Sequence, residues 1–224
     1  RTASPNQFGF IPTRLMSNCS LTLLALIKKL KENYPDAFLL FVDIKAAFDS
    51  AKPELIHSLL QLLYPKSHIP MLIAKLNRAC RGEAHVNGIA GPLIRLTRGT
   101  GQGDPASTVK FTLCHHFWIS IIHKLIQDST SSLSQLRIDF QEVAHSSLDP
   151  EIKNNMSSAI PPCAFADDTT MALKTPTDRR AAQEFKAILD DLEEVTGLCV
   201  NPTKSEIVLL YDNPSEEQLA ILAD

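Results

Sequence analysis

Residues 37–50 read AFLLFVDIKAAFDS, an apolar run that ends in an aspartate. The run from Ala37 to Val42 is short, uninterrupted and preceded by a proline and an aspartate, which predicts a buried β-strand. Asp43 therefore stands at the carboxyl end of a predicted strand.

A second acidic stretch is CAFADDTTMAL, residues 163–173. Its composition predicts two short strands, Cys163 to Ala166 and Thr169 to Leu173, joined as a hydrophobic hairpin. Asp167 and Asp168 occupy the tip of that hairpin. The strand and the hairpin together could gather three carboxylates at one edge of a sheet.

Three carboxylates that lie close together repel one another and raise one another's pKa unless a cation lies between them. Mg²⁺ meets this need, because it typically takes one or two carboxylates together with substrate phosphates. Two such ions about 3.5–4 Å apart clamp the attacking and leaving oxygens of a phosphoryl transfer. Taken alone, the Asp-Asp pair also suits an ordinary turn, and Asp43 also suits a strand end or a cap.

The third notable stretch is RGTGQGDPAS, Arg98 to Ser107. Three glycines before a proline-opened helix permit close approach of the backbone to a ligand, although a plain glycine loop with a capped helix explains them as well. The spacing differs from GxxxxGK[ST], which disfavours a P-loop kinase or ATPase, and no GxGxxG follows a strand, which removes the dinucleotide-binding fold.

The rest of the chain alternates helices with strands. The predicted helices are Ser20 to Asn33, Pro53 to Leu63, Pro105 to about Ile126 with Asp104 as its cap, and Asp178 to Thr196 stopped by Gly197. The further strands are Leu198 to Val200 and Glu206 to Tyr211, and Pro214 and Ser215 open one more helix. Helices interleaved with an antiparallel sheet make the fold class α+β, a two-layer sandwich.

Composition limits the class of protein. The chain has 224 residues, 44% of them hydrophobic and 21% charged, with a formal net charge of −3. These values exclude wholesale disorder and a strongly basic nucleic-acid coat, and no apolar run approaches the roughly 20 residues of a membrane span. The five cysteines are scattered without CxxC spacing, which argues against a disulfide framework and fits a reducing compartment.

Residues 114–123, CHHFWISIIH, contain a cysteine and three histidines. On a helix His116 and His123 share a face, whereas His115 points elsewhere. Because no second set of ligands lies nearby, we interpret this stretch, with Trp118, as core rather than as a zinc site.

The order of these segments is more informative than any one of them. The five that matter are QFGFIPTR (Gln7 to Arg14), FVDIKAAFDS (Phe41 to Ser50), RGTGQGDPAS, AFADDTTMAL (Ala164 to Leu173) and TGLCVNPTKSEIV (Thr196 to Val208). In this order they strongly resemble the successive motifs of reverse transcriptases, most closely those of non-LTR (LINE-type) retrotransposons. The resemblance covers nearly the whole chain.

The resemblance implies roles for individual residues. Asp43, Asp167 and Asp168 would be the metal-binding carboxylates of the palm, and the main-chain carbonyl of Ile44 a further ligand. The cofactor would be Mg²⁺, with Mn²⁺ as the alternative. The reaction would be attack of a primer 3′-hydroxyl on a dNTP with release of pyrophosphate.

Further residues would contact the nucleotide. Phe48 matches the family's bulky residue beneath the sugar, which would exclude a 2′-hydroxyl by steric clash. Gln102 and Gly103 match the glutamine-glycine pair placed along the nucleotide and the template strand. Lys204 matches the late lysine thought to protonate or neutralise the departing pyrophosphate.

The implied fold is a polymerase palm, a small antiparallel sheet backed by helices, with partial helical fingers. The expected divisions are residues 1–36 as partial fingers, 37–211 as palm and 212–224 as the start of a truncated helix, with 52–81 as a helical finger-palm junction and 127–158 as a polar insertion within the palm. The expected partners are an RNA template, a DNA primer, dNTPs and the missing fingers, thumb and other domains of a longer polypeptide, without a membrane.

Two alternatives remain at this point. An RNA-directed RNA polymerase also places paired acids on a palm hairpin, and the spacing of Asp43 and Asp49 suits it superficially, whereas Phe48 and the string FADD disfavour it. A palm that only binds nucleic acid or protein as a scaffold would be expected to lose its aspartates, and all three are present.

Overall fold

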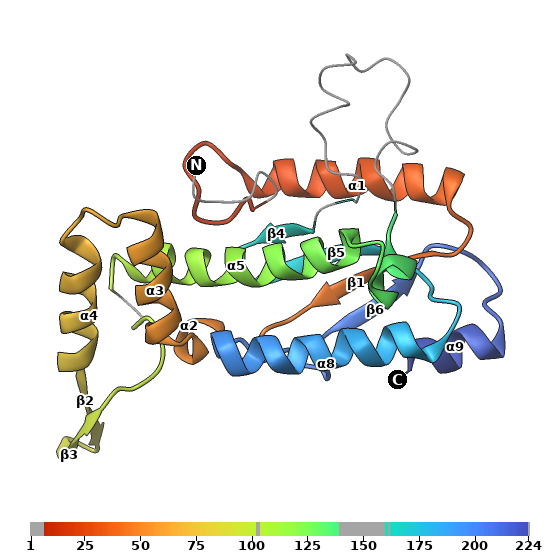
Figure 1. Ribbon diagram of the computed structural model, residues 1–224. Helices are drawn as coiled ribbons and strands as arrows, with labels where there is room; N and C mark the ends of the chain where they lie inside the picture. Colours follow the sequence, from red (N-terminus) through yellow and green to blue (C-terminus); the bar gives the residue numbers. More distant parts are fainter. Residues whose placement is uncertain (1–6, 102–103, 139–159, 161, 224) are drawn as a thin grey trace.

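The protein folds around a four-stranded antiparallel sheet with helices packed against it (Figure 1). The computed structural model describes residues 7–101, 104–138, 160 and 162–223. The strand order is β4-β5-β1-β6, with β1 Ala37–Val42, β4 Cys163–Phe165, β5 Asp168–Lys174 and β6 Glu206–Leu209. This arrangement confirms the predicted α+β class and the small antiparallel sheet backed by helices.

Strand β1 lies in the middle of the sheet and is buried almost throughout. It pairs with β5 so that Phe38 lies opposite Leu173 and Val42 opposite Thr169. On its other side it pairs with β6. A run without alternating polar residues is what a strand covered on both faces requires, which is why the sequence AFLLFV predicts it correctly.

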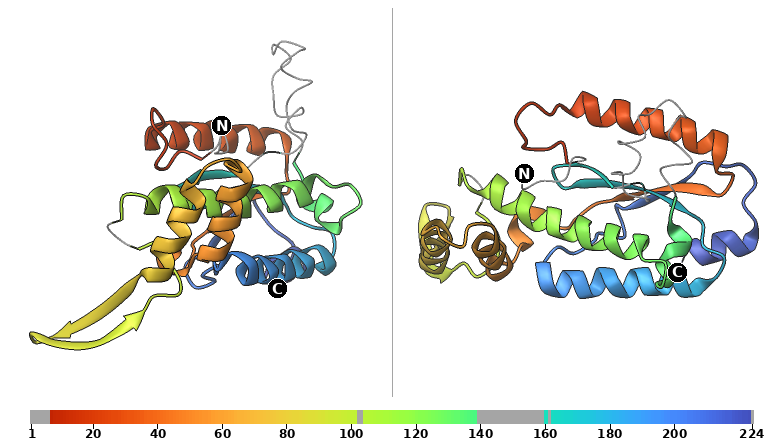
Figure 2. Two further views of the ribbon diagram at one scale, coloured as in Figure 1. Left: turned by 60° about the vertical axis from the view of Figure 1, so that its left-hand side comes forward. Right: turned by 45° about the horizontal axis from the view of Figure 1, so that its top comes forward.

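The two faces of β1 belong to two separate cores. Phe38 and Val42 pack with α3, α5 and α8, whereas Ala37 and Leu39 pack with α1. The right-hand view of Figure 2 shows α1 on one side of the sheet and α5 and α8 on the other. These helices are α1 Met16–Asn33, α3 Pro53–Leu63, α5 Ser107–Gln127 and α8 Arg179–Thr196.

Helix α8 has the ends that its sequence predicts. The Asp178 side chain accepts hydrogen bonds from the main-chain N–H groups of Arg180 and Ala181, and Gly197 ends the helix with a φ of +82°. A Cβ on Gly197 would lie 2.2 Å from the carbonyl oxygen of Ser50, so glycine is required both by conformation and by space.

A second, smaller part of the chain lies to one side of the sheet. It comprises α2 Ala47–Ser50, α3, α4 Ile69–Ala79 and the hairpin of β2 Arg81–Val86 and β3 Ile89–Arg95. The left-hand view of Figure 2 shows this hairpin extending away from the helices. Its turn is Asn87-Gly88, with φ values of +52° and +79°, the pair that a tight two-residue hairpin favours.

Several predicted boundaries are wrong. Helix α1 begins at Met16 rather than Ser20, and α5 begins at Ser107 because Asp104 to Ala106 form a turn first. Asp104 bonds the Ala106 N–H within that turn and is not the cap of the helix. Residues 198–200 form no strand: only Val200 takes part, in an isolated bridge with Ile44.

The end of the chain and the polar stretch are described in part. Ser215 caps α9 Glu216–Leu222 through a capping box with Gln218, as the predicted helix start requires. Within the polar stretch 127–158, Ser132–Leu136 form a short 3₁₀ helix, and residues 139–159 lie outside the described residues. None of the helices described here is long and apolar enough to cross a membrane.

The core of α5 contains a buried histidine. His115 is fully buried, and its Nε2 lies 2.9 Å from the Thr169 hydroxyl while its Nδ1 lies 3.2 Å from Nε2 of Gln7, which is itself buried. Burial, and secondarily the charge of His116, lowers the pKa of His115 to about 3. The ring is therefore neutral at physiological pH and serves the core, as interpreted from the sequence.

The buried neutral ring makes stability depend on pH. In the unfolded chain His115 takes up a proton below its ordinary pKa of 6.5, whereas in the folded chain it does so only near pH 3. Between these two pH values protonation favours the unfolded chain, so the free energy of unfolding decreases as the pH falls. At pH 5 the loss is about 2 kcal/mol of unfolding free energy. Urea denaturation at pH 7.5 and pH 5 should show this loss in the wild type and a smaller one in His115→Gln.

A second measurement covers the case in which His115→Gln does not fold. The ring protons of His115 in the wild-type protein should not titrate in NMR spectra recorded between pH 5 and pH 8. An ordinary titration near pH 6.5 would contradict the neutral, buried state.

Candidate active site

Asp43 lies at the end of β1 and is held by the segment that follows α8. The main-chain N–H of Asn201 bonds the Asp43 carbonyl at 2.8 Å, and its side-chain amide donates to Oδ2 of Asp43 at 2.9 Å. The Asp43 N–H in turn donates to the Ser205 hydroxyl at 3.1 Å. The half-buried carboxylate is thus fixed in place through main-chain and side-chain bonds.

Asp167 and Asp168 lie at the turn between β4 and β5, as predicted. Phe165 pairs with Asp168 across the hairpin, and Ala166 adopts a φ of +59°, a left-handed conformation that is uncommon for alanine. Val42 lies opposite Thr169 in the antiparallel pairing of β1 with β5. One residue beyond this pair, after Val42 on one strand and before Thr169 on the other, Asp43 lies beside Asp168.

Asp168 lies near enough to the other two acids to interact with their charges. The pKa of Asp168 is raised, first by partial burial and then by the negative charges of Asp167 and Asp43. Like charges held together disfavour ionisation in this way. The fold thus brings Asp43 and Asp167 near Asp168, and their role as metal ligands stays a prediction.

The loop before α1 supports the hairpin from behind. The Phe8 N–H donates to the Ala164 carbonyl at 2.7 Å, and the Gln7 side-chain amide donates to the Ala166 carbonyl at 3.2 Å. A Cβ on Gly9 would lie 2.1 Å from the nitrogen of Ala166, so only glycine allows this close approach. The QFGF segment is thus part of the framework of the site.

Lys204 lies near the acids. With Asp43 it lines one cavity of about 310 Å³, shared with Asp168, and a second of about 430 Å³, shared with Asp167 and Phe48. The lysine side chain is exposed and follows the turn that Asn201 begins. A cation at this position can meet negative charge that develops on a group bound between the carboxylates.

Phe48 lies on α2 at the edge of the larger of these cavities. Its ring is half-buried and stacks on the fully buried Phe111 of α5, with centroids 4.6 Å apart. Phe10 meets the ring edge-on at 5.9 Å. The ring is thus part of the core and of the cavity wall at once.

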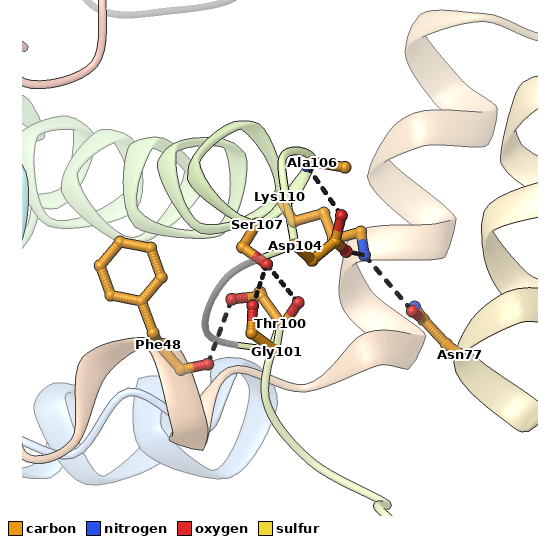
Figure 3. A network of polar contacts seen from close by, with 8 residues as sticks. All are labelled: Phe48, Asn77, Thr100, Gly101, Asp104, Ala106, Ser107 and Lys110. Carbon is orange, nitrogen blue, oxygen red and sulfur yellow. Dashed lines mark hydrogen bonds and ion pairs between the residues drawn. The ribbon is translucent and has the colours of Figure 1, made fainter. Parts of the chain in front are cut away.

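The glycine-rich loop is anchored on both sides of Gln102 and Gly103. Thr100 donates to the carbonyl of Phe48 from its N–H at 2.8 Å and from its hydroxyl at 3.3 Å. The Ser107 hydroxyl donates to the carbonyls of Thr100 and Gly101 (Figure 3). Gln102 and Gly103 themselves lie outside the described residues.

A buried lysine joins this loop to the neighbouring helix. Lys110 donates to Asp104 at 2.6 Å and to the Asn77 side chain of α4 at 3.5 Å (Figure 3). The hydrogen bond from Lys110, followed by that from the Ala106 N–H, lowers the pKa of Asp104. Lys110 therefore connects α5 both to the glycine-rich loop and to α4.

The acids are candidate ligands of a hard cation, the kind of ion that takes oxygen donors. Within the described residues, no group of three or more His, Cys, Asp or Glu side chains is arranged to hold a metal ion. Asp43 and Asp168 nevertheless offer oxygen ligands whose charges interact, and Mg²⁺ commonly takes only one or two carboxylates and completes its shell with phosphates and water.

Sequence reasoning missed the residues that hold the acids. Asn201 and Ser205 bond Asp43, and Gln7 bonds the hairpin tip, although all three belong to motifs that the sequence had singled out. The position of Asn201 before Pro202 indicates a turn in the sequence, but it does not indicate that Asn201 bonds Asp43.

Comparison with solved structures shows the same fold in telomerases. The structure of telomerase from Candida albicans, in complex with a TWJ fragment of telomeric RNA, matches with a TM-score of 0.55 at 14% identity over 94% of this chain and 32% of that one. The corresponding complex from Candida tropicalis matches with a TM-score of 0.60 at 11% identity over 89% and 30%. The chain thus spans about a third of the length of these proteins.

Among curated proteins a search finds no match. Residues 1–222, however, match the family model described as reverse transcriptase (RNA-dependent DNA polymerase). That match spans the acidic hairpin, the strand end at Asp43 and the glycine-rich loop, and on this basis the chain belongs to the reverse transcriptase family.

Proposed function

We propose that this chain is the catalytic palm, with partial fingers, of an RNA-directed DNA polymerase. It joins the α-phosphate of a dNTP to the 3′-hydroxyl of a primer and releases pyrophosphate. The substrates are an RNA template, a DNA primer and dNTPs, and membership of the reverse transcriptase family supports a polymerase of this type.

One observation carries the proposal. Asp43 and Asp167 line a single cavity of about 430 Å³ together with Phe48 and Lys204, and Asp168 is coupled electrostatically to both acids. This cavity combines the groups that a nucleotidyl transfer requires: oxygen ligands for a cation, a ring that can contact a sugar and a cation for the leaving group.

Asp43, Asp167, Asp168 and the main-chain carbonyl of Ile44 would hold Mg²⁺, or Mn²⁺ in its place. When bound, the metal ions polarise the phosphate oxygens and stabilise negative charge on the attacking and leaving groups. Asn201 orients the Asp43 carboxylate for this task through its bond to Oδ2.

The remaining residues bind and select the substrate. The Phe48 ring lies beneath the sugar and excludes a 2′-hydroxyl by steric clash. Lys204 gives a proton, or its positive charge, to the departing pyrophosphate. Gln102 and Gly103 lie along the nucleotide and the template strand.

The motif set also supports an origin and a division of the chain. The five segments from QFGFIPTR to TGLCVNPTKSEIV, taken in their order, favour a non-LTR retrotransposon as the source. We assign residues 1–36 to the fingers, 37–211 to the palm and 212–224 to the helix that follows.

Replacement of Asp167 by asparagine tests the reaction. The change keeps the size of the side chain and removes one charge from the acidic cluster, so metal-assisted stabilisation worth several kcal/mol is lost. Primer extension on an RNA template with Mg²⁺ and dNTPs should fall at least about a thousandfold. The measurement uses the protein at its full natural length.

Asp191→Asn is the matched control, because it removes the same charge from an exposed position on α8. It should leave extension unchanged. A folded wild type that extends no primer would contradict the proposal and favour a palm that serves only as a binding scaffold.

Phe48→Ala tests sugar selection. Without the ring, a 2′-hydroxyl finds space, so the efficiency of ribonucleotide incorporation relative to deoxynucleotide should rise about a hundredfold. Phe48→Tyr keeps the ring and should keep the discrimination. Equal use of rNTPs and dNTPs by the wild type would refute the assignment of Phe48 and favour an RNA-directed RNA polymerase.

Lys204→Gln tests the leaving-group role. In single-turnover incorporation of one dNTP, the maximal rate should fall about a hundredfold while the nucleotide concentration for half-maximal rate changes little. Lys204→Arg, which restores the positive charge, should recover part of the rate. A Lys204→Gln enzyme with the wild-type rate would remove Lys204 from the mechanism.

A further inference from the structure

Phe48 belongs to a continuous stack of rings that runs into the core. Behind it lies Phe111, with centroids 4.6 Å apart and the ring planes inclined by 25°. His115 follows Phe111 at 5.5 Å, and Trp118 follows His115 at 6.0 Å. The last three residues lie at positions i, i+4 and i+7 of α5, so they share one face of that helix.

The rings packed behind Phe48 prevent it from moving toward the core. Phe111, His115 and Trp118 are each fully buried, as expected for an interior packed to the density of a crystal. His115 is in addition held at both ring nitrogens by Gln7 and Thr169. Movement of Phe48 away from the cavity would require this whole stack to move.

The main chain of Phe48 is fixed as well. Its carbonyl accepts from the N–H and the hydroxyl of Thr100, and Thr100 is itself bonded to Ser107 at the start of α5 (Figure 3). The backbone is therefore tied to α5. Phe111 stacks on the ring from the core side and so opposes movement of the ring in that direction.

We propose that Phe111 is a specificity-determining residue, which sets how far the Phe48 ring extends into the cavity and thereby how strictly ribonucleotides are excluded. The inference rests on the proposed function, in which Phe48 lies beneath the sugar. A steric barrier excludes the 2′-hydroxyl only if the ring cannot move, because a ring that can shift away from the sugar admits the hydroxyl at a small cost in free energy. Phe111 never touches the nucleotide and acts through Phe48.

Phe111→Leu tests this support. Loss of the ring leaves a cavity into which Phe48 can relax. In single-nucleotide incorporation by the protein at its full natural length, the ratio of kcat/KM for ATP to that for dATP should rise about tenfold, with dATP incorporation largely retained. The side chain of Phe48 is unchanged, so the gain reports its position.

Phe38→Leu is the matched control. Phe38 is buried, with 4% of its surface exposed against 0% for Phe111, and belongs to the same core, but it lies on β1 and is not one of the rings that stack on Phe48. It should lose comparable stability without any change in the ratio. Phe111→Met, whose unbranched and flexible side chain can fill more of the space behind Phe48, provides a second variant with a smaller expected rise if Phe111→Leu does not fold.

A spectroscopic measurement tests the contact without catalysis. A 4-fluorophenylalanine placed at position 48 should show a fluorine resonance shifted by the stacked Phe111 ring. Phe111→Leu should move that resonance and Phe38→Leu should not. An unmoved resonance in Phe111→Leu would overturn the inference whatever the enzyme does.

The outcomes separate the two claims. An active Phe111→Leu enzyme with the wild-type sugar ratio would overturn the inference and leave the proposed function standing. A folded wild type that incorporates neither nucleotide would overturn the proposed function, and the inference would fall with it.

Discussion

In the pairing of β1 with β5, Val42 lies opposite Thr169, and the acids that follow one strand and open the other come together. The pairing is held in register because each face of β1 belongs to a different core. A slip of one residue would exchange the two faces and separate Asp43 from Asp168. The acidic site therefore depends on side chains that never reach it.

The same dependence holds behind the hairpin. Gly9 lies against Ala166, and Gln7 bonds both the hairpin carbonyl and the buried His115. His115 in turn lies in the stack that ends at Phe48. The His115 ring thus contacts the acidic turn through Gln7 and Phe48 through Phe111. The carboxylates and the residue proposed to contact the sugar are therefore supported by the same buried side chain.

Sequence patterns predicted those elements whose structure is determined by neighbouring residues. The strand AFLLFV, the helix Pro53–Leu63 and the ends of α8 follow from hydrophobic runs, an N-terminal proline and caps. The bonds from Asn201 to Asp43 and from Gln7 to His115 join residues 158 and 108 positions apart, and no local preference encodes such a pairing. The hairpin at Asn87-Gly88 was predictable from its turn and was missed, because the stretch lacks the alternating apolar pattern of a half-buried strand.

The acidic cluster and its packing impose opposite demands. Partial burial, and then repulsion from Asp167 and Asp43, raises the pKa of Asp168, and free side chains would relieve the repulsion by moving apart. Asn201 holds the Asp43 carboxylate, and the close packing of Gly9 against Ala166 holds the main chain of the hairpin beside it. Because the main chain keeps the acids near one another, positive charge placed among them relieves the repulsion. A framework that holds like charges together is therefore one that favours cations and the phosphates that accompany them.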